Sequence, residues 1–153
     1  MIQKVRAWVM IAALVLTGAA ATADAIPAGF NDQDIDWHDL DSGLDAAQAT
    51  GKPIFLVVHA TWCPVCHEYR NVFFHSKIVA QSRNFVFVLV DQDREPNAAA
   101  RYAPDGAYIP RSMVLDATGT LQTKFNSGFS KHRYFLDPSS HKQLSGVLRK
   151  AAR

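Results

Sequence analysis

The sequence predicts an α/β fold with a central mixed sheet of four to five strands and helices on both faces. Two continuous apolar runs rich in valine, residues 54–60 and 85–90, have the composition of strands buried on both faces. The helical pattern between them implies a crossover connection, and therefore parallel pairing. Two short strands joined by a tight turn, residues 112–115 and 120–125, predict an antiparallel hairpin before a closing helix.

The helices of the first half follow from caps and spacing. Ser42 is expected to cap a helix over residues 43–50, which Gly51 ends. A second helix is expected over residues 64–74, directly after the first strand. A further helical stretch over residues 75–83 follows a kink and leads into the second strand.

The second half contains one short helix, the hairpin and a last helix. Residues 93–102 are expected to be helical around their alanines, before a Pro-Asp-Gly turn at residues 104–106. Residues 116–119 form the hairpin turn. Asp137 and Pro138 are expected to cap and start the last helix. Its apolar positions at helical spacing are Leu144, Val147, Leu148 and Ala151.

The first 25 residues have the pattern of a secretory signal peptide. Lys4 and Arg6 precede an apolar run that ends in small residues, which predicts cleavage after Ala23 or Ala25. The alternative is a retained membrane anchor, but the run is short for a span of about 20 residues. No second stretch is suited to crossing a membrane, so we expect an exported protein without stable membrane insertion. The bacterial style of the signal favours the periplasm.

The rest of the chain divides into a polar, acidic lead-in at residues 26–36, expected to be solvated, and a domain at residues 37–153. Removal of residues 1–23 leaves 14 basic and 14 acidic residues, so the formal net charge is zero. With no basic stripe interleaved with aromatics, no nucleic-acid partner is expected. Two cysteines are too few for a disulfide scaffold of the small secreted kind. We expect a monomer.

Both cysteines lie in the run Trp-Cys-Pro-Val-Cys-His at residues 62–67, directly after the first strand. A Cys-x-x-Cys pair at a strand–helix junction is a redox signature, and thiols at this spacing can form a disulfide with little backbone movement. Cys63 is expected at the helix N-terminus, where the backbone N–H groups favour a thiolate. Cys66, one turn further in, is expected to be more buried and able to resolve a mixed disulfide.

Two other interpretations of the same run remain. The sequence Cys-x-x-Cys-His is also the attachment site of c-type haem, with His67 as the iron ligand, although a preceding buried strand does not suit small helical cytochromes. Cys63, Cys66, His67 and His59 are conceivable zinc or copper ligands, but no second ligand pair follows. The pattern favours a redox-active Cys63–Cys66 pair that needs no metal or other cofactor.

Further motifs accompany the cysteines along the chain. With Trp62-Cys63 they resemble the thioredoxin fold, and most closely the small thioredoxin-domain proteins of the endoplasmic reticulum and their anterior gradient relatives. The resemblance covers residues 35–150. The matching elements are Asp36-Trp37, Gly51-Lys52-Pro53, Val58-His59, Tyr108-Ile109-Pro110-Arg111, Leu115-Asp116 and Tyr134-Phe135.

This resemblance implies a thiol–disulfide oxidoreductase that acts on protein thiols and disulfides, together with a redox partner that the sequence does not identify. A non-catalytic chaperone or binding module on the same scaffold is the alternative. Some anterior gradient relatives have lost one cysteine, whereas this chain has both Cys63 and Cys66. The presence of both thiols favours catalysis.

Carried over by position, the resemblance also implies roles for individual residues. Cys63 is the attacking thiol and Cys66 the resolving thiol, with Trp62 as an apolar lip beside them. Pro110 is expected to follow a cis peptide bond next to the dithiol. The backbone of Ile109 is then free to pair with an extended substrate segment, as an added strand would.

The sequence departs from the family pattern at two points. Pro64-Val65 between the cysteines differs from the pairs of reducing thioredoxins and of disulfide isomerases, which leaves the direction of electron transfer open. Val57 stands where thioredoxins have a buried acid on the strand. Proton transfer at Cys66 therefore needs another group, and the nearest in sequence are His59 and Glu68.

Two histidines and one arginine complete the expectations. His67 is expected to be a partly exposed helix residue and His59 a hydrogen-bonded histidine of the core or its rim. Both are candidates for tuning the dithiol, because imidazole titrates near neutral pH. Arg111 is expected to donate hydrogen bonds to nearby carbonyl groups rather than to contact substrate.

Overall fold

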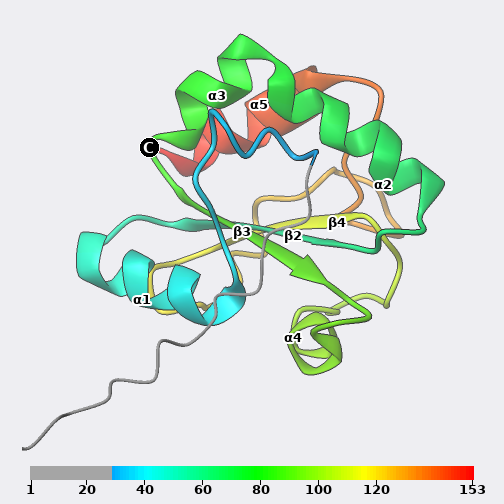
Figure 1. The fold of residues 1–153 in the computed structure, drawn as a ribbon, viewed down its shortest axis with the longest axis horizontal. Coiled ribbons are helices and arrows are strands. Elements are labelled where there is room, and N and C mark those ends of the chain that lie inside the picture. Colours follow the sequence, from blue (N-terminus) through cyan, green and yellow to red (C-terminus); the bar gives the residue numbers. More distant parts are fainter. Residues whose placement is uncertain (1–28) are drawn as a thin grey trace, which may run out of the picture.

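A computed structural model describes residues 29–153 of the chain. The predicted signal peptide at residues 1–25 and its cleavage after Ala23 or Ala25 lie outside the described residues. The described part folds into a four-stranded sheet between two layers of helices (Figure 1). The elements in chain order are β1 (Trp37–His38), α1 (Leu40–Thr50), β2 (Ile54–His59), α2 (Pro64–Tyr69), the 3-10 helix η1 (Arg70–Phe74), α3 (Ser76–Ser82), β3 (Val86–Asp91), α4 (Pro96–Arg101), β4 (Arg111–Leu115) and α5 (His141–Ala151).

The sheet is mixed, as predicted, with the strand order β1-β3-β2-β4. β1 and β2 both run parallel to β3, and β4 runs antiparallel to β2. In the β2–β3 register, Ile54 is opposite Val86 and His59 is opposite Asp91. Because the two strands are parallel, their carboxyl ends meet at one edge of the sheet.

Helices cover both faces of the sheet, which confirms the predicted α/β architecture. Helices α2, α3 and α5 lie on one face and α1 and α4 on the other (Figure 1). The first face has an aromatic core that includes Trp37, Phe55, Tyr69, Phe73 and Phe87. The second face has a mainly aliphatic core that includes Leu40, Ile54, Leu56, Val88 and Met113. Among the described residues, no helix is both long and apolar enough to span a bilayer.

The predicted strand at residues 120–125 is wrong. The segment makes a single bridge to the sheet, between Leu121 and Leu115. The carboxylate of Asp116 explains this, since its Oδ1 accepts hydrogen bonds from the backbone N–H groups of Thr118 and Thr120 and closes a compact turn. The fourth strand of the sheet is instead the short β1, at the opposite edge.

The expectation of a solvated lead-in is also wrong for its apolar residues. Phe30 and Ile35 are buried in the aromatic core, with 4% and 2% of their surface exposed. Trp37 Nε1 donates a hydrogen bond to the carbonyl oxygen of Phe30 at 2.7 Å, and the Asn31 side chain donates one to the carbonyl oxygen of Phe73 at 3.0 Å. Acidic residues between these positions gave the segment its polar composition.

Helix α1 begins earlier than predicted. Its cap is Asp39, whose Oδ1 accepts a hydrogen bond from the backbone N–H of Ser42 at 2.8 Å, so Ser42 is not the cap. The left-handed conformation of Gly51, with φ of 68°, ends the helix as expected.

The other helix limits also differ. The helix expected over residues 64–74 is α-helical only to Tyr69 and continues as η1, and the helix expected over 93–102 is limited to α4. The last helix is capped by Ser140 rather than by Asp137. Asp137 instead accepts hydrogen bonds from the backbone N–H and hydroxyl of Ser139, which keeps this segment in a turn.

Candidate active site: the Cys63–Cys66 pair

Cys63 is the N-cap residue of α2. Its backbone is extended, with φ of −80° and ψ of 113°, and its Sγ accepts a hydrogen bond from the backbone N–H of Cys66 at 3.2 Å. Pro64 occupies the first helical turn, where a missing N–H has no cost. The backbone N–H of Cys63 donates to the carbonyl of Ala60, which fixes the turn between β2 and α2. The sequence therefore places both thiols on one helical turn.

The thiols are covered while their flanking residues are exposed. Cys63 and Cys66 are free cysteines with 5% and 1% of their surface exposed. Trp62 and Val65 are exposed at 62% and 37%. The Trp62 indole is held by a hydrogen bond from Nε1 to Oδ2 of Asp93 at 2.6 Å. Trp62 thus forms an exposed apolar surface next to Cys63 in the chain.

The two thiols differ in their surroundings. Burial raises the pKa of Cys66 to about 12, and the hydrogen bond with Cys63 and the negative charge of Asp91 act in the same direction. Cys66 is therefore a neutral thiol at neutral pH. The sulfur of Cys63 lies at the N-terminus of α2, where it accepts the backbone hydrogen bond from Cys66.

The segment before β4 reaches the dithiol from a distant part of the sequence. Ile109 packs against the small cluster formed by Ala60, Cys63 and Cys66. The peptide bond between Ile109 and Pro110 is cis, the geometry that the resemblance implies. The structure therefore brings both expected residues to the region of the two thiols.

Arg111 anchors this segment from the interior. It is 1% exposed, and its guanidinium donates hydrogen bonds to the carbonyl oxygens of Tyr102, Tyr108 and Ala99. The expectation that Arg111 serves as a structural donor is confirmed. Burial lowers its pKa from the usual value, but a guanidinium remains charged at neutral pH.

A second set of hydrogen bonds ties the same segment to residues 133–134. The Tyr108 hydroxyl donates to Oδ1 of Asp105 at 2.8 Å and accepts from the backbone N–H of Tyr134 at 2.9 Å. The other oxygen of Asp105 accepts from the backbone N–H of Arg133 at 2.7 Å. This network holds the loop that carries Ile109 in place.

The two candidate histidines have opposite environments. His67 is exposed, as expected, and its Nε2 donates a hydrogen bond to the carbonyl oxygen of Thr61 at 2.6 Å. His59 is only 2% exposed, and its ring lies 4.9 Å from the ring of Phe30. Its Nε2 has no hydrogen-bond partner among the described residues, so the expectation of a hydrogen-bonded histidine is wrong at this atom.

A buried acid that the sequence did not mark as a candidate is Asp91. Val57 is fully buried in the aromatic core and cannot exchange a proton, whereas Glu68 is exposed on α2. Asp91 is the last residue of β3, is 4% exposed and is the direct strand partner of His59. The ends of the two apolar runs, at residues 60 and 90, would have paired His59 with Leu89 instead, so this pairing is visible only in the folded chain.

Within residues 29–153 the structure has no group of three or more His, Cys, Asp or Glu side chains arranged to hold a metal ion. The four residues considered as metal ligands are thus not gathered into such a group.

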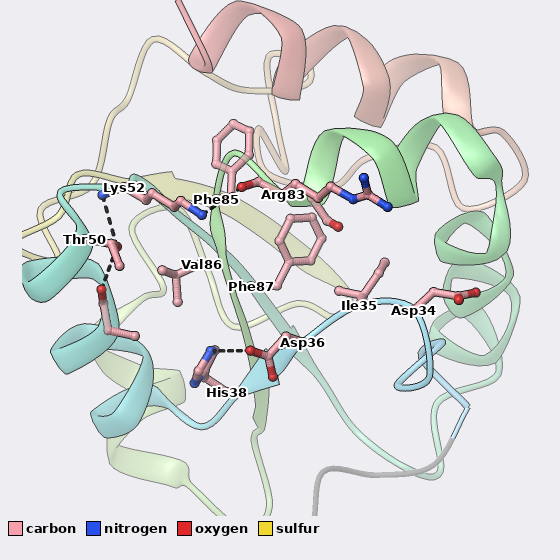
Figure 2. A pocket seen from close by; sticks show the side chains of 12 residues that line it. Asp34, Ile35, Asp36, His38, Thr50, Lys52, Arg83, Phe85, Val86 and Phe87 are labelled. Atoms are coloured by element: carbon pink, nitrogen blue, oxygen red, sulfur yellow. Dashed lines mark hydrogen bonds and ion pairs between the residues drawn. The ribbon is translucent and has the colours of Figure 1, made fainter.

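One cavity lies away from the dithiol, at the sheet edge formed by β1. It has a volume of about 340 Å³ and is lined by residues from the N-terminal segment, α1 and the start of β3, including Asp34, His38, Arg83 and Phe85 (Figure 2). Neither cysteine lines it. The Lys52 ammonium at its rim donates a hydrogen bond to the carbonyl oxygen of Arg83 at 2.9 Å.

Comparison with known proteins agrees with this geometry. Residues 36–117 match the thioredoxin-like family. The chain is 29% identical over 122 residues to anterior gradient protein 3 of Xenopus tropicalis, covering 77% of this chain and 72% of that protein. It is 27% identical over 123 residues to human anterior gradient protein 2 homolog, covering 80% and 69%. Among solved structures, the disulphide isomerase from Xylella fastidiosa Temecula1 superposes with a TM-score of 0.59 at 20% identity, covering 89% of this chain and all of that one.

Proposed function

The chain belongs to the thioredoxin-like family, and we propose that it is an exported thiol–disulfide oxidoreductase whose Cys63–Cys66 pair exchanges disulfides with protein substrates. The observation that carries the proposal is the placement of Cys63 as the cap of α2, with Cys66 one turn behind it and buried. This arrangement places the Cys63 sulfur at the N-terminus of the helix and the Cys66 thiol one turn behind it.

In the reducing direction, the Cys63 thiolate attacks one sulfur of a substrate disulfide. A bond forms between the two sulfurs, and the substrate's other sulfur leaves as a thiolate with the electron pair of the broken bond. The Cys66 sulfur then attacks Cys63, releases the second substrate thiolate and leaves the Cys63–Cys66 disulfide. In the oxidising direction the same steps run in reverse, and the substrate dithiol is oxidised.

Substrate recognition is assigned to the exposed surface beside the dithiol. Trp62 and Val65 offer exposed apolar area next to Cys63, and Ile109 packs against the cluster that contains the two cysteines. The backbone of Ile109 is suited to pair with an extended peptide, which supplies affinity without demanding a particular sequence. Protein thiols and disulfides are therefore the proposed substrates. The redox partner that restores the pair is a dithiol if the pair reduces its substrates and an oxidant such as a disulfide if the pair oxidises them.

The proposed location is the periplasm, and it rests on the signal pattern of residues 1–25. Disulfides form and persist in that compartment. The pair is proposed to work without a metal or haem. A reduced protein with no stoichiometric metal and no haem absorption agrees with this proposal, and the presence of either would overturn it.

The proposed activity is tested by exchange assays on wild type, Cys63→Ser and Cys66→Ala. Wild type is expected to catalyse insulin reduction or dithiol oxidation, and Cys63→Ser is expected to have no activity. Circular dichroism of both variants controls for folding. Full activity of a folded Cys63→Ser protein would contradict the mechanism.

The direction of transfer is decided by the reduction potential of the pair, measured against glutathione. A value near −270 mV is that of a reductant such as thioredoxin, and a value near −120 mV is that of a strong oxidant. The Pro64-Val65 pair between the cysteines is the sequence feature expected to set it.

A further inference from the structure

The resolving step needs a proton acceptor. Cys66 must lose its proton before it attacks the mixed disulfide on Cys63, yet burial raises its pKa to about 12. At neutral pH Cys66 is therefore held as the neutral thiol. Val57 occupies the strand position where the resemblance led us to expect a buried acid, and it has no group that exchanges protons. Another residue must take the proton.

His59 and Asp91 are placed for this role by the sheet. They are direct partners in the parallel register of β2 and β3, and both are the last residues of their strands. Side chains alternate along a strand, and Phe55, Val57, Phe87 and Leu89 all lie in the aromatic core. His59 and Asp91 therefore face the same side of the sheet as α2, which carries the two cysteines.

Two observations connect His59 and Asp91 to the two cysteines, one from packing and one from electrostatics. Ala60 follows His59 in the chain and packs directly against Cys63 and Cys66. After burial, the charge of Asp91 is among the influences that raise the pKa of Cys66, and it also opposes the lowering of the His59 pKa by burial. Asp91 is thus within electrostatic reach of both the thiol and the imidazole.

The imidazole of His59 is neutral and can accept a proton. Burial lowers its pKa, so the ring is neutral at neutral pH. Its Nε2 is buried and has no hydrogen-bond partner among the described residues. A buried polar atom without a partner destabilises the fold, so its presence calls for a reason. The adjacent carboxylate of Asp91 stabilises an imidazolium once it forms.

We propose that His59 accepts the proton of Cys66 during the resolving step, with Asp91 as the residue that positions and stabilises it. The proposal rests on the oxidoreductase function above. In the step, the Cys66 sulfur forms a bond to Cys63, and the bond from Cys63 to the substrate sulfur breaks. The substrate sulfur leaves with that electron pair, and the Cys66 proton passes to His59 and from there to solvent or to the released thiolate.

Other titratable groups act on His59, and the test must separate them. These groups are Asp91 and Asp93 at and after the end of β3, and His67 on α2. Burial lowers the pKa of His59, and His67 lowers it further. Asp91 and Asp93 both raise it, and the effect of Asp91 is the larger of the two. Asp93 is held by the Trp62 indole and His67 by the carbonyl of Thr61, which leaves Asp91 as the buried partner.

The test is a single turnover of reduced protein with one equivalent of an aromatic disulfide that releases a coloured thiolate at each attack. The first release reports the Cys63 attack and the second reports resolution by Cys66. His59→Gln and Asp91→Asn are expected to slow the second release about 10²-fold at pH 7 and to leave the first unchanged. The deficit is expected to shrink about tenfold per pH unit in alkali, where hydroxide takes the proton instead.

Matched controls are His38→Gln on β1 and Asp45→Asn on α1, which are expected to match wild type in both releases. The proposal would be overturned if folded His59→Gln and Asp91→Asn proteins release the second thiolate as fast as wild type. It would also be overturned if their second release is slowed by the same factor at all pH values. Loss of the first release in wild type would instead overturn the oxidoreductase function. If neither variant folds, NMR titration of His59 in wild type decides. A pKa that differs between the dithiol and disulfide forms supports the proposal, and an identical pKa contradicts it.

Discussion

The backbone N–H of Cys66 donates a hydrogen bond to the sulfur of Cys63 across 3.2 Å. A single sulfur atom therefore has two functions: it caps α2 and it is the proposed nucleophile. Stabilisation of negative charge on this sulfur and stabilisation of the helix are thus the same interaction. Stability and reactivity at Cys63 can be separated by substitution.

Cys63→Ala removes the cap acceptor together with the nucleophile, whereas Cys63→Ser retains an oxygen that can accept the same hydrogen bond. Both variants are expected to lose disulfide exchange. Cys63→Ala is expected to be less stable than Cys63→Ser by about 0.5–2 kcal/mol in the free energy of unfolding, measured by urea titration of the reduced proteins. Equal stability of the two variants would show that the sulfur does not act as a cap.

Stability of the reduced protein is expected to fall in alkali. Burial raises the folded-state pKa of Cys66 from 9.0 to about 12, so the unfolded chain releases this proton first as the pH rises. The contribution of Cys66 to the free energy of unfolding is fully present below about pH 9 and is lost as the pH rises through about 12. Urea titrations between these values should show a steeper loss for reduced wild type than for Cys66→Ala. Parallel curves would contradict the raised pKa.

His59 contributes a pH dependence of stability that is opposite in sign to that of Cys66. Burial lowers the folded-state pKa of His59 from 6.5, so the unfolded chain binds this proton more readily than the folded chain. The contribution of His59 to the free energy of unfolding is present above about pH 6.5 and is lost as the pH falls towards the lower pKa that His59 has in the folded state. His59→Gln is expected to flatten the pH dependence of unfolding in this range, with His38→Gln as the matched control. An unchanged slope in His59→Gln would contradict the account.

Two helical glycines differ in what a methyl group would meet. A Cβ on Gly43 of α1 would lie 2.3 Å from Cγ2 of Val88 on β3, whereas a Cβ on Gly146 of α5 would meet no described atom within 4 Å. Gly43→Ala is expected to destabilise the fold by about 1–3 kcal/mol through overpacking. Gly146→Ala is expected to stabilise it by about 0.5–1 kcal/mol through helix propensity. Thermal and urea unfolding of both variants check the pair, and a stabilising Gly43→Ala would contradict the close packing of α1 on β3.

Arg111 is expected to be the most sensitive charged residue for stability. Arg111→Met leaves buried carbonyl oxygens of Tyr102, Tyr108 and Ala99 without their donor. Each unsatisfied group costs about 1–3 kcal/mol, so a loss of about 3 kcal/mol or more is expected. Arg149→Met on the exposed face of α5 is the control and is expected to change stability by less than about 0.5 kcal/mol. Similar losses in the two variants would contradict the anchoring role.

The sequence predicted the central strands and the order of the helices, because these depend on strong local signals. The apolar runs that became β2 and β3 are buried on both faces, which is what their composition indicates. The predicted strand at residues 120–125 failed because one side chain, Asp116, takes up backbone N–H groups that a sheet ladder would have used. Local turn chemistry of this kind competes with strand formation and is not visible in hydrophobic periodicity.

The site was predictable in part for a similar reason. The Cys-x-x-Cys spacing and the apolar strand before it locate the thiols on the first turn of α2. The position of Asp91 beside His59 depends on which strand lies next to β2 and in what register. This is a tertiary property. Burial of Phe30 over His59 likewise comes from a segment whose composition is polar. Both facts require the folded chain.

The central claim is that Cys63 attacks and Cys66 resolves. It is tested most directly by mass spectrometry of the Cys66→Ala protein after incubation with a disulfide-containing protein such as insulin. The account predicts a stable mixed disulfide on Cys63 that a reductant releases, and no such adduct with Cys63→Ala, in which the raised pKa of the remaining thiol, Cys66, keeps it neutral. An equal yield of adduct on Cys66 in Cys63→Ala, or no adduct on Cys63 in Cys66→Ala, would contradict the account.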